Sequence, residues 1–227
     1  MANLIDFVLH IDTHLVNIVN NFGDWSYVIL FLIIFIETGA VVLPFLPGDS
    51  LLFAAAALAA NPDYGLNIWI FVAVFLAAPI LGDSTNFFIG HFLGSKLKTT
   101  SWFNKAVKPE YFDQTEEFFE KHGAMSITLA RFMPIIRTFA PFIAAGSGLK
   151  YSSFIRHNLI GAVVWVALCC GAGFFFGNMP FVKEHFSFIV IGIIVVSLIP
   201  AIVGLLKSRT SPTHASKEIS TPIDEKD

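Results

Sequence analysis

Charged side chains are scarce in this chain. Asp, Glu, Lys and Arg together make up 14% of its 227 residues, whereas a soluble domain carries about 25%. Too few polar side chains are therefore present to cover a surface that faces water. The composition argues against a cytosolic enzyme and against a nucleic-acid-binding protein.

Cysteine is almost absent. The chain has two, Cys169 and Cys170, which are neighbours inside an apolar run. Adjacent residues of a helix point in different directions, so we interpret them as small core hydrophobes. Neither a disulfide framework nor a zinc-binding set is available, and we expect no metal or cofactor. No set of nucleophile, base and metal ligands occurs, so we do not expect an enzyme.

Basic residues are missing from the first part of the chain. No Lys or Arg precedes Lys96, although seven acidic residues do. The N-terminus thus lacks the basic segment of a secretory signal, and we expect no cleaved signal peptide.

Apolar residues are abundant instead, at 55% of the chain, with 25 Phe among them. Each crossing of a bilayer takes about 20 residues. We therefore predict an all-α polytopic membrane protein, whose membrane domain covers residues 25–207 and contains four transmembrane helices. The predicted spans are residues 28–43, 66–92, 154–176 and 186–206.

The two ends of the chain differ from the predicted membrane domain. Residues 1–24 alternate apolar and polar groups as an amphipathic helix at the membrane interface does. The polar face of such a helix explains its acidic and histidine side chains better than a metal site does. These side chains are Asp6, His10, Asp12 and His14. Residues 208–227 have too few apolar groups to fold, which predicts a disordered tail.

Two apolar segments are too short or too broken to span the membrane. Residues 51–60 would reach about 15 Å as a helix, half of a bilayer. We predict re-entrant helical hairpins over residues 44–60 and 124–148, opening to opposite sides of the membrane as an inverted repeat would. The residues that break the helices are Pro44, Pro47, Gly48, Pro134 and Pro141.

The basic residues predict the orientation. Most of them lie in a polar insert at 95–122, in a loop at 150–156, and after residue 207. Four spans and one hairpin that enters from the cytoplasm put all three segments, and both termini, in the cytoplasm, as the positive-inside rule requires. Pro109 begins an amphipathic helix in the insert, and we expect its aromatic side chains to lie on the membrane. These are Phe112, Phe118 and Phe119.

Five ionisable residues fall within or beside the apolar segments. They are Glu37, Asp49, Asp83, Arg131 and Arg137. An ionised group at the centre of a bilayer costs at least about 2.5–3.5 kcal/mol, so such residues indicate a functional site. Arginine binds phosphate through two parallel hydrogen bonds, and a carboxylate in an apolar site can exchange a proton.

The resulting hypothesis assigns phosphate binding to Arg131 and Arg137 and proton coupling to Glu37 and Asp49, with Asp83 as a possible further member. An alternative is that Glu37 and Asp49 pair with the arginines only to hold the hairpins together.

The same residues carry a resemblance to a known family. The relevant runs are Glu37-Thr-Gly, Pro44-Phe-Leu-Pro-Gly-Asp49, Gly82-Asp83, Arg131-Phe-x-Pro134-x-x-Arg137 and Asn158-x-x-Gly161-x-x-x-Trp165. From about residue 5 to residue 206 the chain resembles the DedA family of bacterial inner-membrane proteins, which is similar to the VTT lipid scramblases. The resemblance implies a multi-pass protein of the bacterial cytoplasmic membrane that flips undecaprenyl phosphate or phosphatidylethanolamine and takes part in proton-dependent membrane homeostasis. The family's acidic pair and arginine pair fall on Glu37, Asp49, Arg131 and Arg137.

We therefore expect a flippase for a phosphate-bearing lipid, with undecaprenyl phosphate first, coupled to H⁺ or Na⁺. The alternatives are a flippase or scramblase of phosphatidylethanolamine, a proton-coupled transporter of a small ion or drug, and an assembly factor without transport. Membrane lipids are the expected partners, and a homo-oligomer is possible. Gly171, Gly173 and Gly177 could line its interface or serve helix packing within the chain.

Overall fold

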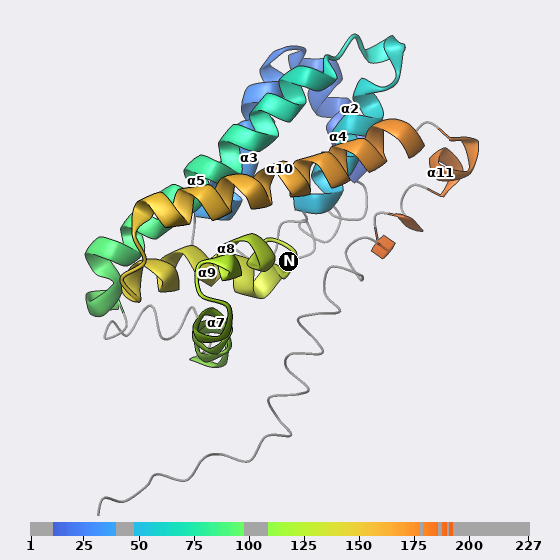
Figure 1. Ribbon diagram of the computed structural model, residues 1–227. Helices are drawn as coiled ribbons and strands as arrows, with labels where there is room; N and C mark the ends of the chain where they lie inside the picture. The colour runs from blue at the N-terminus through green and yellow to red at the C-terminus, as the bar shows by residue number, and fades with distance from the viewer. Residues whose placement is uncertain are drawn as a thin grey trace, which may run out of the picture.

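The computed structural model describes residues 11–39, 48–97, 109–177, 179–185, 188–189 and 191–192. All regular structure within these ranges is helical, which confirms the predicted all-α class (Figure 1). The helices are α2 (Ile11–Phe22), α3 (Trp25–Gly39), α4 (Gly48–Ala59), η1 (Pro62–Tyr64), α5 (Ile68–Leu97), α7 (Pro109–His122), α8 (Met125–Ala130), α9 (Pro134–Gly146), α10 (Tyr151–Phe176) and α11 (Pro180–Glu184).

Two helices in the described part of the chain are long and apolar enough to cross a membrane. These are α5 with 30 residues and α10 with 26, or about 45 and 39 Å at 1.5 Å per residue. They confirm helices at the predicted spans 66–92 and 154–176. α5 continues without interruption past Pro79 and Asp83, as predicted.

The other two predicted spans are described only in part. α3 has 15 residues and corresponds to the predicted span 28–43. Residues 40–47, with Pro44 and Pro47, lie outside the described residues, as do nearly all of 186–206 and the predicted tail 208–227.

The segments predicted as hairpins contain short helices. α4 has 12 residues, α8 has 6 and α9 has 13. None exceeds about 20 Å, less than the roughly 30 Å of a hydrocarbon core. A turn at residues 131–133 joins α8 to α9. The lengths agree with two re-entrant hairpins, which stay a prediction because the structure contains no membrane.

The prediction that Pro141 breaks its helix is wrong. α9 begins at Pro134 and runs through Pro141 to Gly146. A proline removes one backbone donor and weakens the turn before it. The side chain of Asn86 donates a 2.8 Å hydrogen bond to the carbonyl of Thr138 in that turn, and such side-chain contacts let a membrane helix tolerate proline.

Close contact between α4 and α10 depends on two glycines. A Cβ atom at Gly173 would lie 2.2 Å from the carbonyl oxygen of Phe53, and one at Gly177 would lie 2.2 Å from Cβ of Ala57. By contrast, a Cβ atom at Gly171 would meet nothing within 4 Å. The predicted glycine seam therefore serves packing within the chain at two of its three positions.

The aromatic face of α7 is covered by protein. Phe118 and Phe119 pack against the hydrophobic cluster that α5, α8, α9 and α10 form, and Thr115 on the same helix is fully buried. Phe118 and Phe119 are therefore partly buried on protein, and their contact with the membrane stays a prediction. The side chain of Phe112 and residues 98–108 of the insert lie outside the described residues.

The helix at the N-terminal end is amphipathic, as predicted. Leu15 and Val19 of α2 are buried against a bundle that includes α3 and α4, whereas Asn17 and Asn20 are exposed. Residues 1–10 lie outside the described residues.

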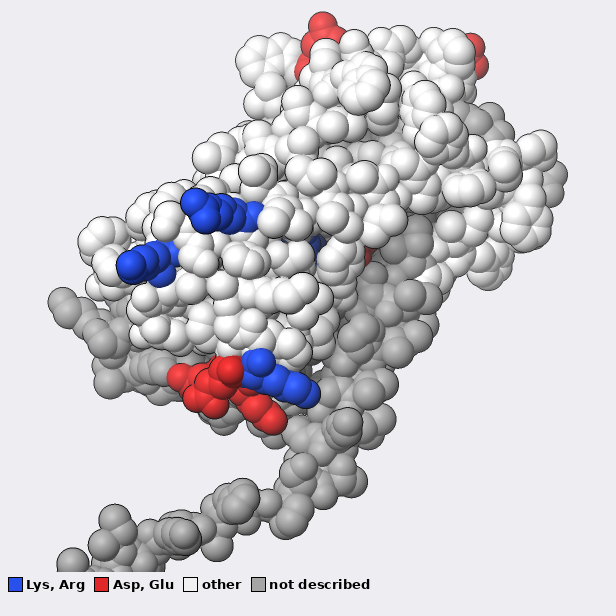
Figure 2. Space-filling model, viewed as in Figure 1, with Lys and Arg blue, Asp and Glu red and all other residues white. Residues whose placement is uncertain are grey.

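The outer surface has polar ends and an apolar middle. Figure 2 shows Lys and Arg at the end of the visible face that carries α7 and the start of α10, together with Asp and Glu on α7. Asp and Glu without basic neighbours lie at the opposite end, and few charged atoms lie between the two ends. The side chains of Trp25 and Trp69 are 69% and 75% exposed, as expected for aromatic residues at a membrane interface. Large apolar side chains lie exposed on the long helices, among them Leu32, Leu81, Leu159, Val163 and Phe175.

The glycine contacts predict an asymmetry along α10. We expect Gly173→Ala to lower the thermal unfolding midpoint in detergent, because the added methyl group overpacks a backbone contact at a cost of about 1–3 kcal/mol. Gly171→Ala is the matched control and should not lower it. Equal midpoints for the two variants would contradict this packing.

Candidate functional site

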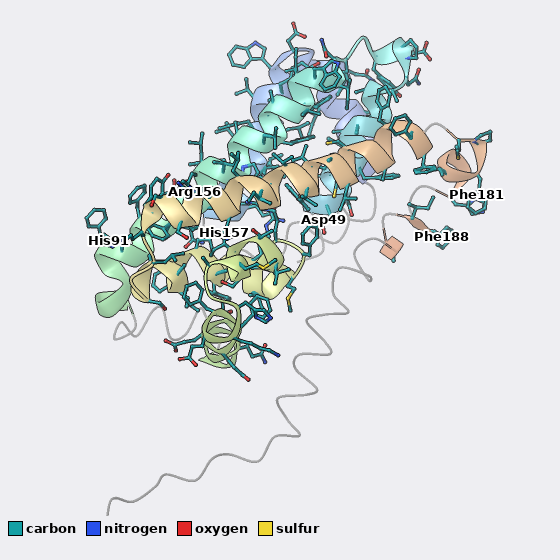
Figure 3. All side chains as sticks on the ribbon, in the orientation of Figure 1. Asp49, His91, Arg156, His157, Phe181 and Phe188 are labelled. Carbon is teal, nitrogen blue, oxygen red and sulfur yellow. The ribbon has the colours of Figure 1, made fainter. Side chains whose placement is uncertain are left out.

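The five ionisable residues predicted from the sequence come together in the structure. Glu37 lies near the end of α3, Asp49 at the start of α4, and Asp83 within α5. Arg131 follows α8, and Arg137 lies one turn into α9. Figure 3 shows Asp49 beside the middle of α10, away from Arg156 and His91 at the polar end. Segments far apart in the sequence thus supply one charged cluster inside the bundle.

Arg131 is held in a buried network. Its Nη2 donates to Oδ2 of Asp83 at 2.5 Å, and the two side chains are only 2% and 6% exposed. The same nitrogen donates to the side-chain oxygen of Asn158. A Cβ atom at Gly161 would lie 3.3 Å from Nε of Arg131, so this glycine provides room for the guanidinium. Arg131 therefore connects the α8–α9 turn to α5 and α10.

Arg137 has a looser partner. Its Nη1 lies 3.9 Å from Oδ1 of Asp49, and the side chains are 12% and 27% exposed. This is beyond hydrogen-bond distance. The Nη2 atom of Arg137 is buried and has no hydrogen-bond partner among the described residues. The Arg137 guanidinium is thus attracted to a carboxylate without being bound by it.

Trp165 of α10 lies against both arginines. The centre of its ring is 4.5 Å from Cζ of Arg137 and 5.7 Å from Cζ of Arg131, within range of a cation–π interaction. Its Nε1 donates a 2.6 Å hydrogen bond to Oδ1 of Asp49. The indole therefore contacts an acid and both bases at once.

Glu37 lies against the start of α4. A Cβ atom at Gly48 would be 2.8 Å from Oε2 of Glu37, and this oxygen is buried without a hydrogen-bond partner among the described residues. The N-terminus of a helix carries partial positive charge, which favours an acid there. The charges of Arg137 and Asp49 also act on Glu37. Gly48, predicted only as a helix breaker, thus also lets Glu37 and Asp49 approach each other.

The pairing differs from the alternative derived from the sequence, in which Glu37 and Asp49 neutralise both arginines. Asp83 is the partner of Arg131, and only Arg137 lies near Asp49. The sequence could not identify this partner, because the distance between α5 and α8 depends on how the helices cross.

Two site residues were not singled out as such from the sequence. Asn158 and Trp165 lie with Gly161 on one face of α10, at spacings of three and seven residues. A buried amide within an otherwise apolar span is a signal that could have identified this face. In the described residues, no group of three His, Cys, Asp or Glu side chains gathers as a metal site requires.

Apolar outer faces around a buried charged cluster are the features of a membrane protein with ionisable groups inside its helical bundle. The model of the VTT domain matches residues 46–175, a range that includes Asp49, Asp83, Arg131 and Arg137. The chain belongs to this family, the DedA family of membrane proteins.

Curated relatives match most of the length of the chain in sequence. It is 47% identical over 214 residues to Protein DedA of Escherichia coli strain K12, covering 94% of this chain and 97% of that protein. An uncharacterized membrane protein of Mycobacterium tuberculosis is 38% identical over 86% of this chain and 85% of its own length. The inner membrane protein YghB of Escherichia coli strain K12 is 31% identical, covering 79% and 78%. No solved structure matches the chain.

The buried network predicts that Asp83 matters more for stability than Asp49. Asp83→Leu leaves Arg131 buried without its counter-charge, which costs about 3–5 kcal/mol, so the unfolding midpoint in detergent should fall sharply. Asp49→Leu should lower it less, because Arg137 is more exposed and keeps its contact with Trp165.

The double variant Asp83→Leu/Arg131→Met removes both charges and should recover most of the lost stability. If it unfolds as readily as Asp83→Leu alone, the ion pair is not the reason for the loss.

Proposed function

We propose that this protein is a flippase that moves a phosphate-bearing lipid, undecaprenyl phosphate, across the bacterial cytoplasmic membrane, coupled to H⁺ or Na⁺. The observation that carries the proposal is the state of Arg137. Its guanidinium lies inside an apolar bundle. One of its nitrogens is buried and has no hydrogen-bond partner in the part of the chain that the structure describes, and the nearest carboxylate, 3.9 Å away, is too distant for a hydrogen bond.

A phosphate group would satisfy this guanidinium. Leaving a buried donor without an acceptor costs about 1–3 kcal/mol, and phosphate accepts two parallel hydrogen bonds from arginine. Arg131 has less to offer, because Asp83 and Asn158 already occupy its Nη2. Its Nη1 is buried, has no hydrogen-bond partner within the described ranges, and could add one contact. We therefore assign the main phosphate contact to Arg137 and a supporting charge to Arg131.

The balance of charge supports cation coupling. The cluster contains three carboxyl groups, those of Glu37, Asp49 and Asp83, and two guanidinium groups, those of Arg131 and Arg137. When all are ionised, one negative charge is unbalanced inside the bundle, which is costly there. A proton or a sodium ion on Glu37 or Asp49 would remove it. An anionic headgroup would bring the imbalance back, so binding of the lipid and binding of the cation favour each other.

The surface supports a lipid as the cargo. Exposed apolar side chains of α3, α5 and α10 face outward between the polar ends, so an acyl chain could remain in the bilayer while its headgroup passes through the bundle. The end that carries the visible Lys and Arg in Figure 2 would face the cytoplasm, as the positive-inside rule requires. Cytoplasmic termini are part of the proposal.

Loss of Arg137 should abolish most of the transport. The assay uses purified protein in liposomes with undecaprenyl phosphate, an enzyme outside that traps the lipid reaching the outer leaflet, and an imposed pH or Na⁺ gradient. We expect Arg137→Ala to slow transport about tenfold or more, since a hydrogen bond to a charged group contributes about 1.5–3 kcal/mol. Arg137→Lys should be impaired as well, because it keeps the charge and loses the two-pronged geometry.

Arg156→Ala is the control, since this arginine is exposed at the polar end of α10. Normal transport by well-expressed Arg137→Ala protein would refute the proposal. Transport of phosphatidylethanolamine in place of undecaprenyl phosphate would show that the assigned substrate is wrong.

Neutralising Glu37 should separate transport from its driving force. We expect Glu37→Gln to lose the stimulation by the gradient while it retains slow, gradient-independent exchange, because the amide takes up no proton and lacks the negative charge that attracts Na⁺. Glu117→Gln is the control, since Glu117 is exposed on α7. Full stimulation of Glu37→Gln would assign the coupling to another group.

A further inference from the structure

We propose that Trp165 is a ligand of the transported anion. Its indole N–H and the Arg137 guanidinium would both donate hydrogen bonds to the oxygens of a tetrahedral oxyanion, which would bind where the carboxylate of Asp49 now lies. The inference deepens the proposed function and depends on it only for the identity of the anion as a lipid phosphate.

The two donors converge on one oxygen. Oδ1 of Asp49 is 2.6 Å from Nε1 of Trp165 and 3.9 Å from Nη1 of Arg137. The carboxylate is thus hydrogen-bonded to the indole but only electrostatically attracted to the arginine. It is tethered to the start of α4 and cannot bridge the gap without moving. A free tetrahedral anion has more oxygens than a carboxylate, and they point in several directions. It could therefore accept hydrogen bonds from Trp165 and Arg137 at once.

The indole is fixed in place and restricted in what it can bind. Trp165 is 2% exposed, and its ring packs against the guanidinium groups of Arg137 and Arg131. An indole N–H donates and never accepts, and a buried tryptophan usually finds a partner for it. When Asp49 moves away, another acceptor must replace it, and an anion is the acceptor that the neighbouring arginines attract.

The exposure of the cluster indicates how an anion would enter. The side chain of Asp49 is 27% exposed and that of Arg137 is 12% exposed, whereas those of Arg131 and Asp83 are 2% and 6% exposed. The accessible side of the site is therefore the side of Asp49. Glu37 adds a second negative charge near Asp49. Asp49 acts as an internal competitor, and an incoming anion has to displace it.

Calorimetry in detergent micelles at fixed pH and ionic strength tests the site directly. The probes are inorganic phosphate and dodecyl phosphate, which separate a free anion from a lipid headgroup. Trp165→Phe keeps a ring over Arg137 and removes the N–H, so we expect it to weaken binding of dodecyl phosphate about tenfold. Asp49→Asn removes the competing charge and should strengthen binding. Trp69→Phe is the control, since Trp69 is 75% exposed.

A second measurement leaves Trp165 in the protein. In a variant with Trp25, Trp69 and Trp102 replaced by Phe, the emission of the remaining Trp165 should change with dodecyl phosphate and saturate. The inference would be overturned if Trp165→Phe bound dodecyl phosphate with unchanged affinity or if Asp49→Asn bound it more weakly. It would also be overturned if the emission of Trp165 did not change with dodecyl phosphate. So would a wild-type protein that binds neither probe.

The two proposals fail in different ways. Binding that depends on Trp165, together with no movement of lipid in liposomes, would leave the anion site standing and refute the flippase. Lipid movement that needs Arg137 but is indifferent to Trp165→Phe would leave the flippase standing and refute the ligand role of Trp165.

Discussion

The structure depends on the cost of ionised groups inside an apolar bundle. That cost has two different solutions within one cluster. Arg131 and Asp83 form a short, buried ion pair that Asn158 completes, so this part of the cluster is neutral and rigid. Arg137 and Asp49 lie 3.9 Å apart, Trp165 contacts both of them, and Glu37 is a neighbouring acid. The first arrangement stabilises the helices around it, and the second retains unsatisfied electrostatic attraction that a ligand can use.

Close helix packing makes this cluster possible. The side chain of Asp is short, so the helix backbones that carry Asp49 and Asp83 must come near the arginines. Glycine provides the approach where needed: Gly48 beside Glu37, Gly161 beside Arg131, and Gly173 where α10 crosses α4. The charged cluster therefore depends on the small residues, because the glycines set the distances at which the charges interact.

Much of the architecture could be predicted from the sequence, because a bilayer requires long apolar helices and makes buried charged groups costly. Long apolar runs predicted the helices that became α5 and α10, and the misplaced charges predicted every ionisable member of the cluster. The partners did not follow, because pairing depends on how the helices cross. Asp83 was the weakest of the five predictions and proved to be the partner of Arg131. Trp165 was named only as part of a family motif, without a role, although its N–H donates to Asp49. Pro141 read as a helix end, but Asn86 on another helix supports the turn that it weakens.

The position of α7 has a mechanical consequence. This helix carries exposed charged side chains on one face, while Phe118 and Phe119 pack on the short helices α8 and α9. α9 also carries Arg137 one turn from its start. Packed helices transmit displacement because protein interiors are dense and hardly compressible. A displacement of α7 would therefore be transmitted through α9 to the Arg137 guanidinium, so the position of this charged helix and the geometry of the buried cluster are mechanically coupled.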